Sequence, residues 1–136
     1  MPEPHVTNVS IYYEDTDHSG LVYHANYLKY AERSREHVLG RESLVALYRD
    51  EGVGFVVYKA EMVFREGARF GDELEVRTTV EMASTYRLIF RQPVFRKGGA
   101  TPLVEILIEL VAVDAQNKLV RLPPTIQAMV AERFPA

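Results

Sequence analysis

The stretch that decides the fold runs from residue 74 to residue 113 and reads LEVRTTVEMASTYRLIFRQPVFRKGGATPLVEILIELVAV. Its side chains alternate between apolar and polar with a period of two. From Leu74 to Met82, the even positions are apolar or Thr and the odd positions are charged or Thr. Successive side chains of a strand point to opposite faces of a sheet, so this pattern predicts a strand with one dry face.

The alternation continues through two further segments. Apolar residues at the next alternating positions predict a second strand, at Tyr86, Leu88, Phe90 and Val94. Lys97–Ala100 contains paired glycines, which accept the positive φ of a hairpin turn. The returning segment 104–112 has Glu105 and Glu109 four residues apart, as a helix would, but its β-branched content favours a strand.

Two more strands are expected outside this stretch. Phe55–Phe64 is a fourth candidate, closed by Gly67 and by the turn residues Phe70–Asp72. These four segments predict an antiparallel meander. Val6–Tyr13 is a possible further strand at the N-terminal end.

A sheet with one apolar face needs a cover, and a helix is its best candidate. A helix is predicted from about Ala25 to Leu39, with residues at helical spacing and Gly40 as its stop; the spaced residues are Tyr27, Ala31, Ser34 and Val38. A short second helix is expected at Glu42–Glu51, and a third at Thr125–Phe134, after Pro123 and Pro124. The prediction is a single α+β domain over residues 1–136, with one long helix on an antiparallel sheet.

Composition excludes several classes of protein. The chain has 136 residues, 47% of them apolar and 26% charged, with a net charge of −3 and no basic block, so nucleic acid is not an expected partner. The absence of cysteine excludes disulfides and a cysteine nucleophile. The start, MPEPHVTNV, does not resemble a signal peptide, and the longest apolar run, 103–113, is too short for a membrane span. We therefore expect a cytoplasmic protein.

Residues 12–27, YYEDTDHSGLVYHANY, carry the candidate chemistry. Turn and capping roles would explain many of these polar residues. A calcium loop would use Asp15, Asp17, Ser19 and Gly20, but position twelve is Asn26 where a bidentate glutamate is needed. A serine triad is disfavoured because Asp17, His18 and Ser19 are consecutive in the chain and cannot adopt the triad geometry.

A further interpretation is a lone carboxylate, Asp17, aimed at a thioester carbonyl. Free N–H groups and the positive dipole at the start of the following helix would stabilise an oxyanion. A thiol has a pKa of about 8.5, so a thioester needs no strong general acid to release it. One carboxylate and one oxyanion site would then suffice.

The run YYEDTDHSGLVYHANYLKYAERSRE resembles the N-terminal signature of the 4-hydroxybenzoyl-CoA thioesterase family of hotdog folds. It is most similar to the branch that contains the bacterial Tol–Pal-associated acyl-CoA thioesterase. Weaker similarity continues through FREGARFGDELEV to RLPPTI. The resemblance implies an antiparallel sheet wrapped around the long helix, an acyl-CoA substrate, no cofactor or metal, and sheets joined edge to edge into a dimer or a dimer of dimers.

The resemblance also assigns roles to single residues. Asp17 matches the catalytic carboxylate, as nucleophile or general base, and the His24 backbone N–H lies where the family polarises the thioester carbonyl. Tyr13 and the His24 side chain match positions tied to activity, whereas Asp15 is expected to be structural. The branch usually has a basic residue before the strand that starts at Tyr86, but this chain has none there. The remaining candidates for contact with coenzyme A are Arg87, Lys118 and Arg121.

Two rival functions stay open at this point. One is a non-catalytic acyl-CoA-binding module on the same fold, which the presence of Tyr13, Asp17 and His24 argues against. The other is a calcium-binding structural domain. The sequence does not define the acyl group, and it does not distinguish nucleophilic from general-base use of Asp17.

Overall fold

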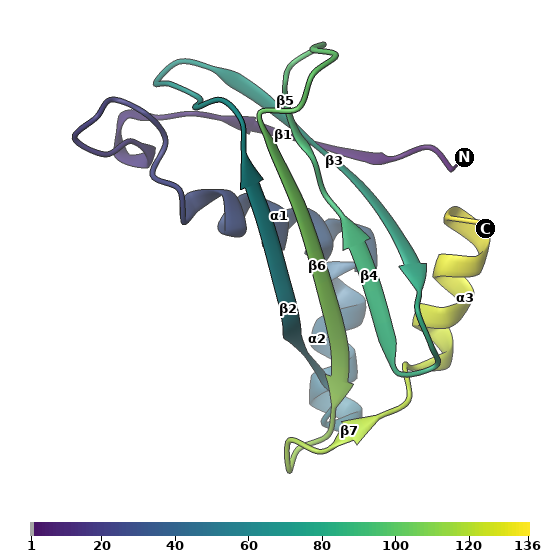
Figure 1. Cartoon of the computed structure of the whole chain (residues 1–136). Helices are drawn as coiled ribbons and strands as arrows, with labels where there is room; N and C mark the ends of the chain where they lie inside the picture. The colour runs from purple at the N-terminus through teal and green to yellow at the C-terminus, as the bar shows by residue number, and fades with distance from the viewer. Residues whose placement is uncertain (1) are drawn as a thin grey trace.

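The alternating segments form one antiparallel sheet, in a computed structural model that describes residues 2–136 (Figure 1). The predicted α+β class is confirmed, with a long helix packed on one face of the sheet. The strands are β1 (His5–Ser10), β2 (Gly54–Phe64), β3 (Glu73–Met82), β4 (Arg87–Arg91), β5 (Val94–Arg96), β6 (Val104–Val113) and β7 (Leu119–Val120).

The predicted four-stranded meander is wrong in one connection. The order of the main strands is β1-β3-β4-β6-β2, so β2 pairs with β6 and not with β3, the next strand in the chain. The reason is that β3 already has β1 on one side and β4 and β5 on the other. The chain therefore crosses from one flank of the sheet to the other between β2 and β3, through residues 65–72.

Two predicted strands are also shorter than expected. The N-terminal strand ends at Ser10, and Tyr13–Asp15 forms a single 3₁₀ turn, η1. The strand predicted to run from Tyr86 to Val94 divides into β4 and β5 at Gln92 and Pro93. Proline has no N–H for the sheet ladder, and strands usually break or bulge there.

The predicted helices form close to their expected limits: α1 (Asn26–Leu39), α2 (Arg41–Glu51) and α3 (Pro124–Arg133). The four α1 residues at helical spacing, Tyr27, Ala31, Ser34 and Val38, are all buried, as predicted. Gly40 ends α1 with a φ of 91°, in the left-handed region that residues with a Cβ seldom adopt. α1 therefore lies with one face against the sheet and packs chiefly on β3 and β1.

The core lies between α1 and the inner face of the sheet. The inward side chains of β3, β4 and β6 are fully buried, including Leu74, Val76, Leu88, Phe90 and Ile108. Burying a side chain of this size contributes about 1.5–3 kcal/mol to stability. The predicted dry face is therefore the face that α1 covers.

A chain of polar groups crosses this apolar layer. Thr7 Oγ1 lies 2.9 Å from Ser34 Oγ, which lies 2.8 Å from Thr78 Oγ1. Gln92 Nε2 donates to Thr78 Oγ1 at 3.1 Å and to the Ala31 carbonyl at 2.8 Å. Each of these groups gains a partner inside the core, which removes most of the penalty for burying it.

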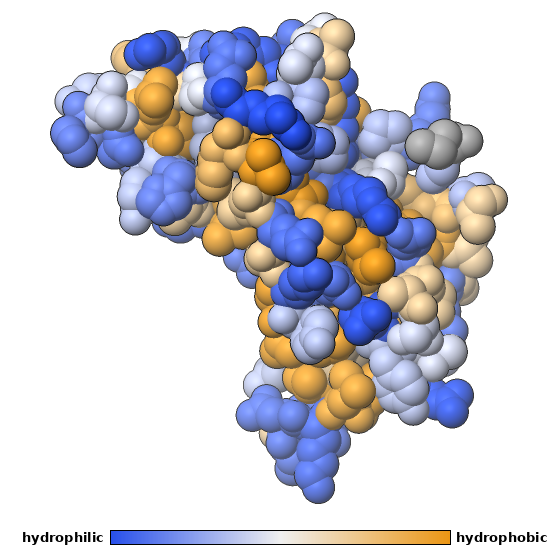
Figure 2. Space-filling model, viewed as in Figure 1, coloured by the Kyte–Doolittle hydropathy of each residue, from blue (hydrophilic) through white to orange (hydrophobic). Residues whose placement is uncertain are grey.

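Strand β2 is an uncovered edge. Its inward residues, identified from their pairing with buried β6 residues, include Val57 and Phe64, which are 51% and 49% exposed. Val56 and Val63 point to the other face and are exposed as well. Figure 2 shows the sheet face turned away from α1, where hydrophobic residues lie among hydrophilic ones. An edge strand that is apolar on both faces is a site for pairing with another chain.

No helix formed by residues 2–136 is long and apolar enough to cross a membrane.

Replacing Thr78 by valine tests the polar chain. The change keeps the shape of the side chain but leaves the Ser34 hydroxyl and the Gln92 amide each one partner short. We expect the free energy of unfolding, measured by urea denaturation, to fall by about 1–3 kcal/mol. Thr79→Val, one residue along on the outer face, should change it by less than about 0.5 kcal/mol. Equal effects of the two substitutions would show that the network adds no stability.

Candidate active site

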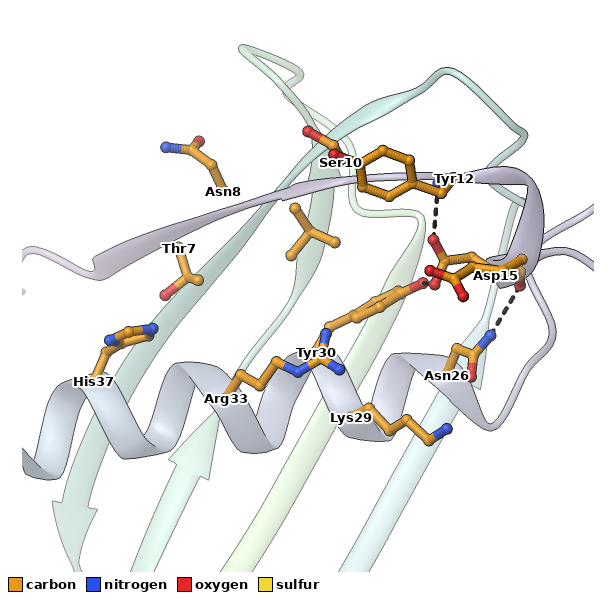
Figure 3. Close-up of a pocket in the computed structure, with 12 residues that line it drawn as sticks. Thr7, Asn8, Ser10, Tyr12, Asp15, Asn26, Lys29, Tyr30, Arg33 and His37 are labelled. Carbon is orange, nitrogen blue, oxygen red and sulfur yellow. Dashed lines mark hydrogen bonds between the residues drawn. The ribbon is translucent and has the colours of Figure 1, made fainter. Parts of the chain in front are cut away.

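Asp15 fixes the loop that precedes α1. Its carboxylate accepts hydrogen bonds from the Tyr12 N–H and the Tyr30 hydroxyl, both at 2.8 Å (Figure 3). Its carbonyl accepts from the Asn26 side chain at 2.8 Å and from the Tyr23 N–H at 2.9 Å. Burial and the bond to Asp15 raise the pKa of Tyr30, which stays a neutral donor. These contacts give Asp15 the structural position expected for it.

Asp17 lies two residues further on, at the start of a tight turn. Its N–H donates to the Leu21 carbonyl at 2.9 Å, and its carbonyl accepts from the Gly20 N–H at 3.0 Å. Gly20 has a φ of 85°, which the turn requires. The turn is closed by short bridges between Thr16 and Val22 and between Leu21 and Arg69.

One oxygen of the Asp17 carboxylate is held by Ser19. The Ser19 hydroxyl donates to Oδ1 at 2.5 Å, and the Ser19 N–H donates to the same oxygen at 2.8 Å. These bonds, the hydroxyl first, hold the pKa of Asp17 below its ordinary value. The side chain is only half-buried. Asp17 is therefore a charged carboxylate at neutral pH, with its Oδ2 free of hydrogen bonds from residues 2–136.

Asp17 and His24 line the same open cavity, of about 310 Å³, between the loop and the end of β2. The His24 ring packs against Tyr23 at 4.7 Å and meets Phe64 edge-on at 6.2 Å, measured between ring centroids. Within residues 2–136, no acceptor takes a hydrogen bond from the His24 N–H. The cavity is thus lined by Asp17, an ionised carboxylate, and by His24, a residue just before α1 whose N–H has no acceptor within residues 2–136.

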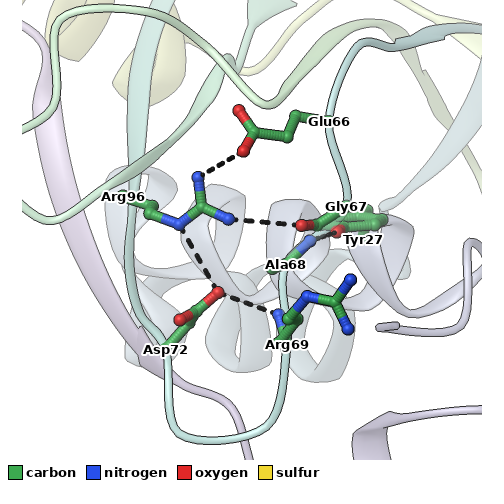
Figure 4. A network of polar contacts seen from close by, with 7 residues as sticks. All are labelled: Tyr27, Glu66, Gly67, Ala68, Arg69, Asp72 and Arg96. Atoms are coloured by element: carbon green, nitrogen blue, oxygen red, sulfur yellow. Dashed lines mark hydrogen bonds and ion pairs between the residues drawn. The ribbon is translucent and has the colours of Figure 1, made fainter. Parts of the chain in front are cut away.

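A second polar network supports the far wall of this cavity (Figure 4). The Arg96 guanidinium donates to Glu66 at 3.0 Å and to the Gly67 carbonyl at 3.3 Å, and it lies 3.5 Å from Asp72. The Ala68 N–H donates to the Tyr27 hydroxyl at 3.2 Å. Local sequence patterns do not indicate Arg96, because its hydrogen-bond partners Glu66 and Gly67 are 30 and 29 residues away in the chain.

Gly67 is required at this wall by close packing. A Cβ built on it would lie 2.9 Å from both terminal methyl groups of Leu21. The backbone of the 65–72 crossing can therefore approach the Asp17 turn. The sequence indicated a turn at Gly67, but it did not indicate that the turn meets the loop.

The other predicted site residues lie elsewhere in the single chain. Tyr13 is 78% exposed, lies edge-on to Phe70 at 6.1 Å between ring centroids, and does not line the Asp17 cavity. Arg87, on β4, pairs with buried Glu109 at 3.0 Å. Lys118 and Arg121 flank β7, at the end of the sheet opposite the loop (Figure 1).

The carboxylates of the loop do not form a metal cage. Asp15 uses its two oxygens on Tyr12 and Tyr30, and Asp17 uses one on Ser19. Over residues 2–136, no group of three His, Cys, Asp or Glu side chains converges in a way that could hold a metal ion. Asp15, Ser19 and Gly20, three of the positions proposed for calcium, thus take part in hydrogen bonds of the loop itself.

Comparison with known proteins identifies the family to which the chain belongs. Residues 12–134 match the thioesterase-like superfamily. The chain is 40% identical over 83 residues to the acyl-CoA thioesterase YbgC of Helicobacter pylori, an alignment that spans 60% of this chain and 61% of that protein. It is 35% identical over 129 residues to the acyl-CoA thioester hydrolase YbgC of Escherichia coli O157:H7, covering 91% of each.

Solved structures agree with the fold. A probable thioesterase from Bartonella henselae superposes with a TM-score of 0.79 at 30% identity, covering 88% of this chain and 99% of that one. A 1,4-dihydroxy-2-naphthoyl-CoA thioesterase from Synechocystis gives a TM-score of 0.86 at 23% identity, covering 93% and 95%. The likeness to the Synechocystis protein concerns the fold alone, and together these structures confirm the predicted hotdog arrangement.

Ser19→Ala tests the control of the Asp17 charge. Loss of the hydroxyl donor should raise the pKa of Asp17 toward the ordinary value of about 3.9, because the charged form loses its strongest hydrogen bond. Carboxyl ¹³C NMR through an acid titration measures this pKa directly. Ser10→Ala removes a hydroxyl that donates to Glu73 and should leave Asp17 unchanged. An unchanged pKa of Asp17 in the Ser19→Ala protein would show that the Ser19 hydroxyl does not lower that pKa.

Proposed function

The chain belongs to the thioesterase-like superfamily, and from this we propose that it hydrolyses acyl-CoA thioesters to a free acid and coenzyme A. Relatives named as acyl-CoA thioesterases or thioester hydrolases, 31% to 40% identical, support the predicted class of thioester hydrolase. The observation that carries the proposal is that Asp17, whose carboxylate is ionised, and His24, whose N–H has no acceptor within residues 2–136, line one cavity.

The chemistry has one demanding step, the addition of an oxygen nucleophile to the thioester carbonyl. As the oxygen adds, the C=O electrons move onto the carbonyl oxygen, and the His24 N–H stabilises that charge. The C–S bond then breaks as the carbonyl re-forms, and coenzyme A leaves as a thiolate that takes a proton from solvent. A thiol pKa of about 8.5 makes this departure easy without a strong acid.

Asp17 supplies the nucleophile by one of two routes. As a general base, it removes a proton from the attacking water. As a nucleophile, its free oxygen adds to the carbonyl, releases thiolate and leaves an anhydride that water then hydrolyses. Both routes need Asp17 ionised, as an aspartate is at neutral pH, and the hydrogen bonds from Ser19 favour the ionised form further by lowering its pKa. The proposal gives the His24 ring, which contacts Tyr23 and Phe64, the role of orienting water or the carbonyl.

The Asp17 cavity is open to solvent in the single chain, and we propose that a second copy of the chain encloses it. The exposed apolar residues of β2 lie beside the Asp17 cavity, and Phe64 belongs to both. Joining two β2 edges by a two-fold axis perpendicular to the sheet makes the strands antiparallel and keeps both α1 helices on one side. A dimer of this kind, or a pair of such dimers, encloses the substrate.

Antiparallel pairing also changes the neighbours of the predicted coenzyme A residues. It moves the β7 end of the partner toward the loop end of the first chain, which favours contacts from the partner's Lys118 and Arg121. Arg87 is a weaker candidate because it pairs with Glu109. Tyr13 remains a proposed active-site residue, at the rim of the shared site. The cytoplasmic location remains a prediction from the sequence.

Asp17→Asn tests the catalytic role. The amide keeps the size of the side chain but removes its charge, so we expect turnover of acyl-CoA thioesters to fall about a hundredfold or more. Release of free thiol, followed with a chromogenic reagent, measures turnover. Asp50→Asn on exposed α2 is the control and should retain the wild-type rate. If wild-type protein binds acyl-CoA but hydrolyses none of it, the non-catalytic binding module is correct.

Val63→Lys tests the assembly. Val63 is half exposed in the single chain, so the substitution costs little in a monomer but places charges in an apolar strand-to-strand contact. We expect light scattering to show a smaller species and turnover to fall with it. Val45→Lys, on the exposed face of α2, should change neither. A fully active Val63→Lys monomer would contradict a shared active site.

A further inference from the structure

Arg35 is a buried cation without a matching anion. It lies on α1, is 6% exposed, and donates one hydrogen bond, from Nη1 to Gln92 Oε1 at 3.0 Å. It forms no ion pair with any carboxylate in residues 2–136. A guanidinium has five N–H donors, so most of its donors have no partner within the described chain.

The unused donors open into a second cavity. This cavity, of about 220 Å³, lies between α1, α2 and the β2–β6 flank, and Arg35 forms part of its wall. Its other walls are largely apolar, from Leu39, Leu44, Phe55, Val57 and Leu110. No nitrogen of Arg35 is among the enclosed atoms of residues 2–136 that lack a hydrogen bond, so the remaining nitrogens face accessible space.

Such an arrangement is costly unless it serves a ligand. Burial of an unpaired charge destabilises a fold, and an apolar side chain of the same volume would fill this place at lower cost. Gln92 satisfies only one donor, and burial lowers the pKa of Arg35, although it stays charged. Polar groups that violate the packing rules of a core are expected at binding sites.

The cavity rim selects the kind of ligand. Exposed Glu32 and half-buried Glu36 line the rim on the same face of α1, and their charges act on Arg35 without contacting it. A ligand that carries its own carboxylate would be repelled by Glu32 and Glu36 as it entered the cavity. A neutral oxygen can accept from Arg35 without that repulsion, and a hydroxyl can also donate to a glutamate.

We propose that this cavity receives the far end of the acyl group and that Arg35 selects aliphatic acyl chains carrying an uncharged oxygen, a hydroxyl or a ketone. The proposal rests on the acyl-CoA hydrolysis and the β2-to-β2 dimer proposed above. A plain alkyl chain packs against the apolar walls of the cavity. It displaces water from the Arg35 guanidinium, however, and leaves the N–H donors of Arg35 without acceptors. Sites built to hydrogen-bond a substrate oxygen reject analogues that lack it.

The two cavities meet across the dimer. Phe64 at one end of β2 lines the Asp17 cavity, and Phe55 and Val57 near the other end line the Arg35 cavity. Antiparallel β2 strands set one end of each strand beside the opposite end of its partner. The Asp17 of one subunit then lies next to the Arg35 cavity of the other, so a short acyl group reaches both.

A matched substrate panel tests the proposal on the full-length wild-type protein. Straight-chain acyl-CoA thioesters of four, six and eight carbons are compared with their ω-hydroxy and ω-carboxy counterparts by kcat/KM. We expect the hydroxyacyl substrate to be favoured over the alkyl one by about ten- to a hundredfold at the length that reaches Arg35, the range of a hydrogen bond to a charged group. The carboxylate should rank below the hydroxyl. An alkyl preference at every length, or a preference for the carboxylate, overturns the proposal.

Arg35→Met tests the residue. It keeps an unbranched side chain about as long as the aliphatic part of arginine and removes the charge, so the kcat/KM values of hydroxyacyl and alkyl substrates should become equal within about threefold. Arg33→Met removes an exposed cation from the same helix and should keep the wild-type ratio. An unchanged ratio in a folded Arg35→Met protein refutes the role of Arg35. If Arg35→Met does not fold, Leu44→Trp narrows the same cavity and should lower kcat/KM for the longer substrates only.

Failure of the proposed function is a separate result. If the wild-type protein hydrolyses no acyl-CoA, that function is wrong, and calorimetric dissociation constants for the same hydroxyacyl and alkyl pairs then test the cavity alone. Tighter binding of the hydroxyacyl member, lost in Arg35→Met, supports the site without catalysis. Equal dissociation constants overturn it.

Discussion

A single helix is too narrow to cover this sheet, and most features of the molecule follow from that mismatch. An α-helix is about 10–12 Å across, whereas strands lie about 4.8 Å apart, so one helix shields two or three strands. α1 packs chiefly on β3 and β1, and β2 receives its main helical contact from α2. The inner face of β2 is consequently left open, although its residues are apolar. That open flank is where the Asp17 cavity and the Arg35 cavity are both found.

Hydrogen bonds hold the loop before α1 in one conformation and still leave the charged Asp17 carboxylate accessible. Asp15 and Asp17 are two residues apart and chemically alike, yet hydrogen bonding separates their roles. Both carboxylate oxygens of Asp15 accept hydrogen bonds, one from the Tyr12 N–H within the loop and one from the Tyr30 hydroxyl. The bond from Tyr30 fixes the loop to α1. Asp17 is held through one oxygen by Ser19, so its other oxygen is free for the role proposed for it. A carboxylate positioned in this way needs no reorganisation at the moment of reaction, which is the main source of electrostatic catalysis.

Local patterns in the sequence predicted the elements, and long-range contacts decided the rest. The period-two alternation located β3 and β6, and helical spacing identified the buried face of α1. Neither pattern carries strand order, so the position of β2 beside β6 was missed, as was the break at Pro93. Asp17 and His24 are seven residues apart and share a motif, so sequence analysis could place them in one site. Arg96 and Arg35 could not be found, because their surroundings come from Gln92, Glu66 and other residues distant in the chain.

The exposed apolar surface of β2 serves both the proposed dimer contact and the proposed substrate site. The apolar side chains of β2 that favour strand pairing also form the walls of both cavities. In the proposed dimer, burying these side chains also excludes water from the Asp17 cavity. It thereby strengthens the proposed interaction of the His24 N–H with the developing oxyanion, because electrostatic forces grow as the local dielectric falls. The same burial isolates the Arg35 guanidinium, whose unpaired donors then have only the acyl group or trapped water as partners. A substrate oxygen at that position replaces the trapped water as the partner of Arg35. In the proposed dimer, the contact that encloses the active site therefore also determines which acyl groups are preferred.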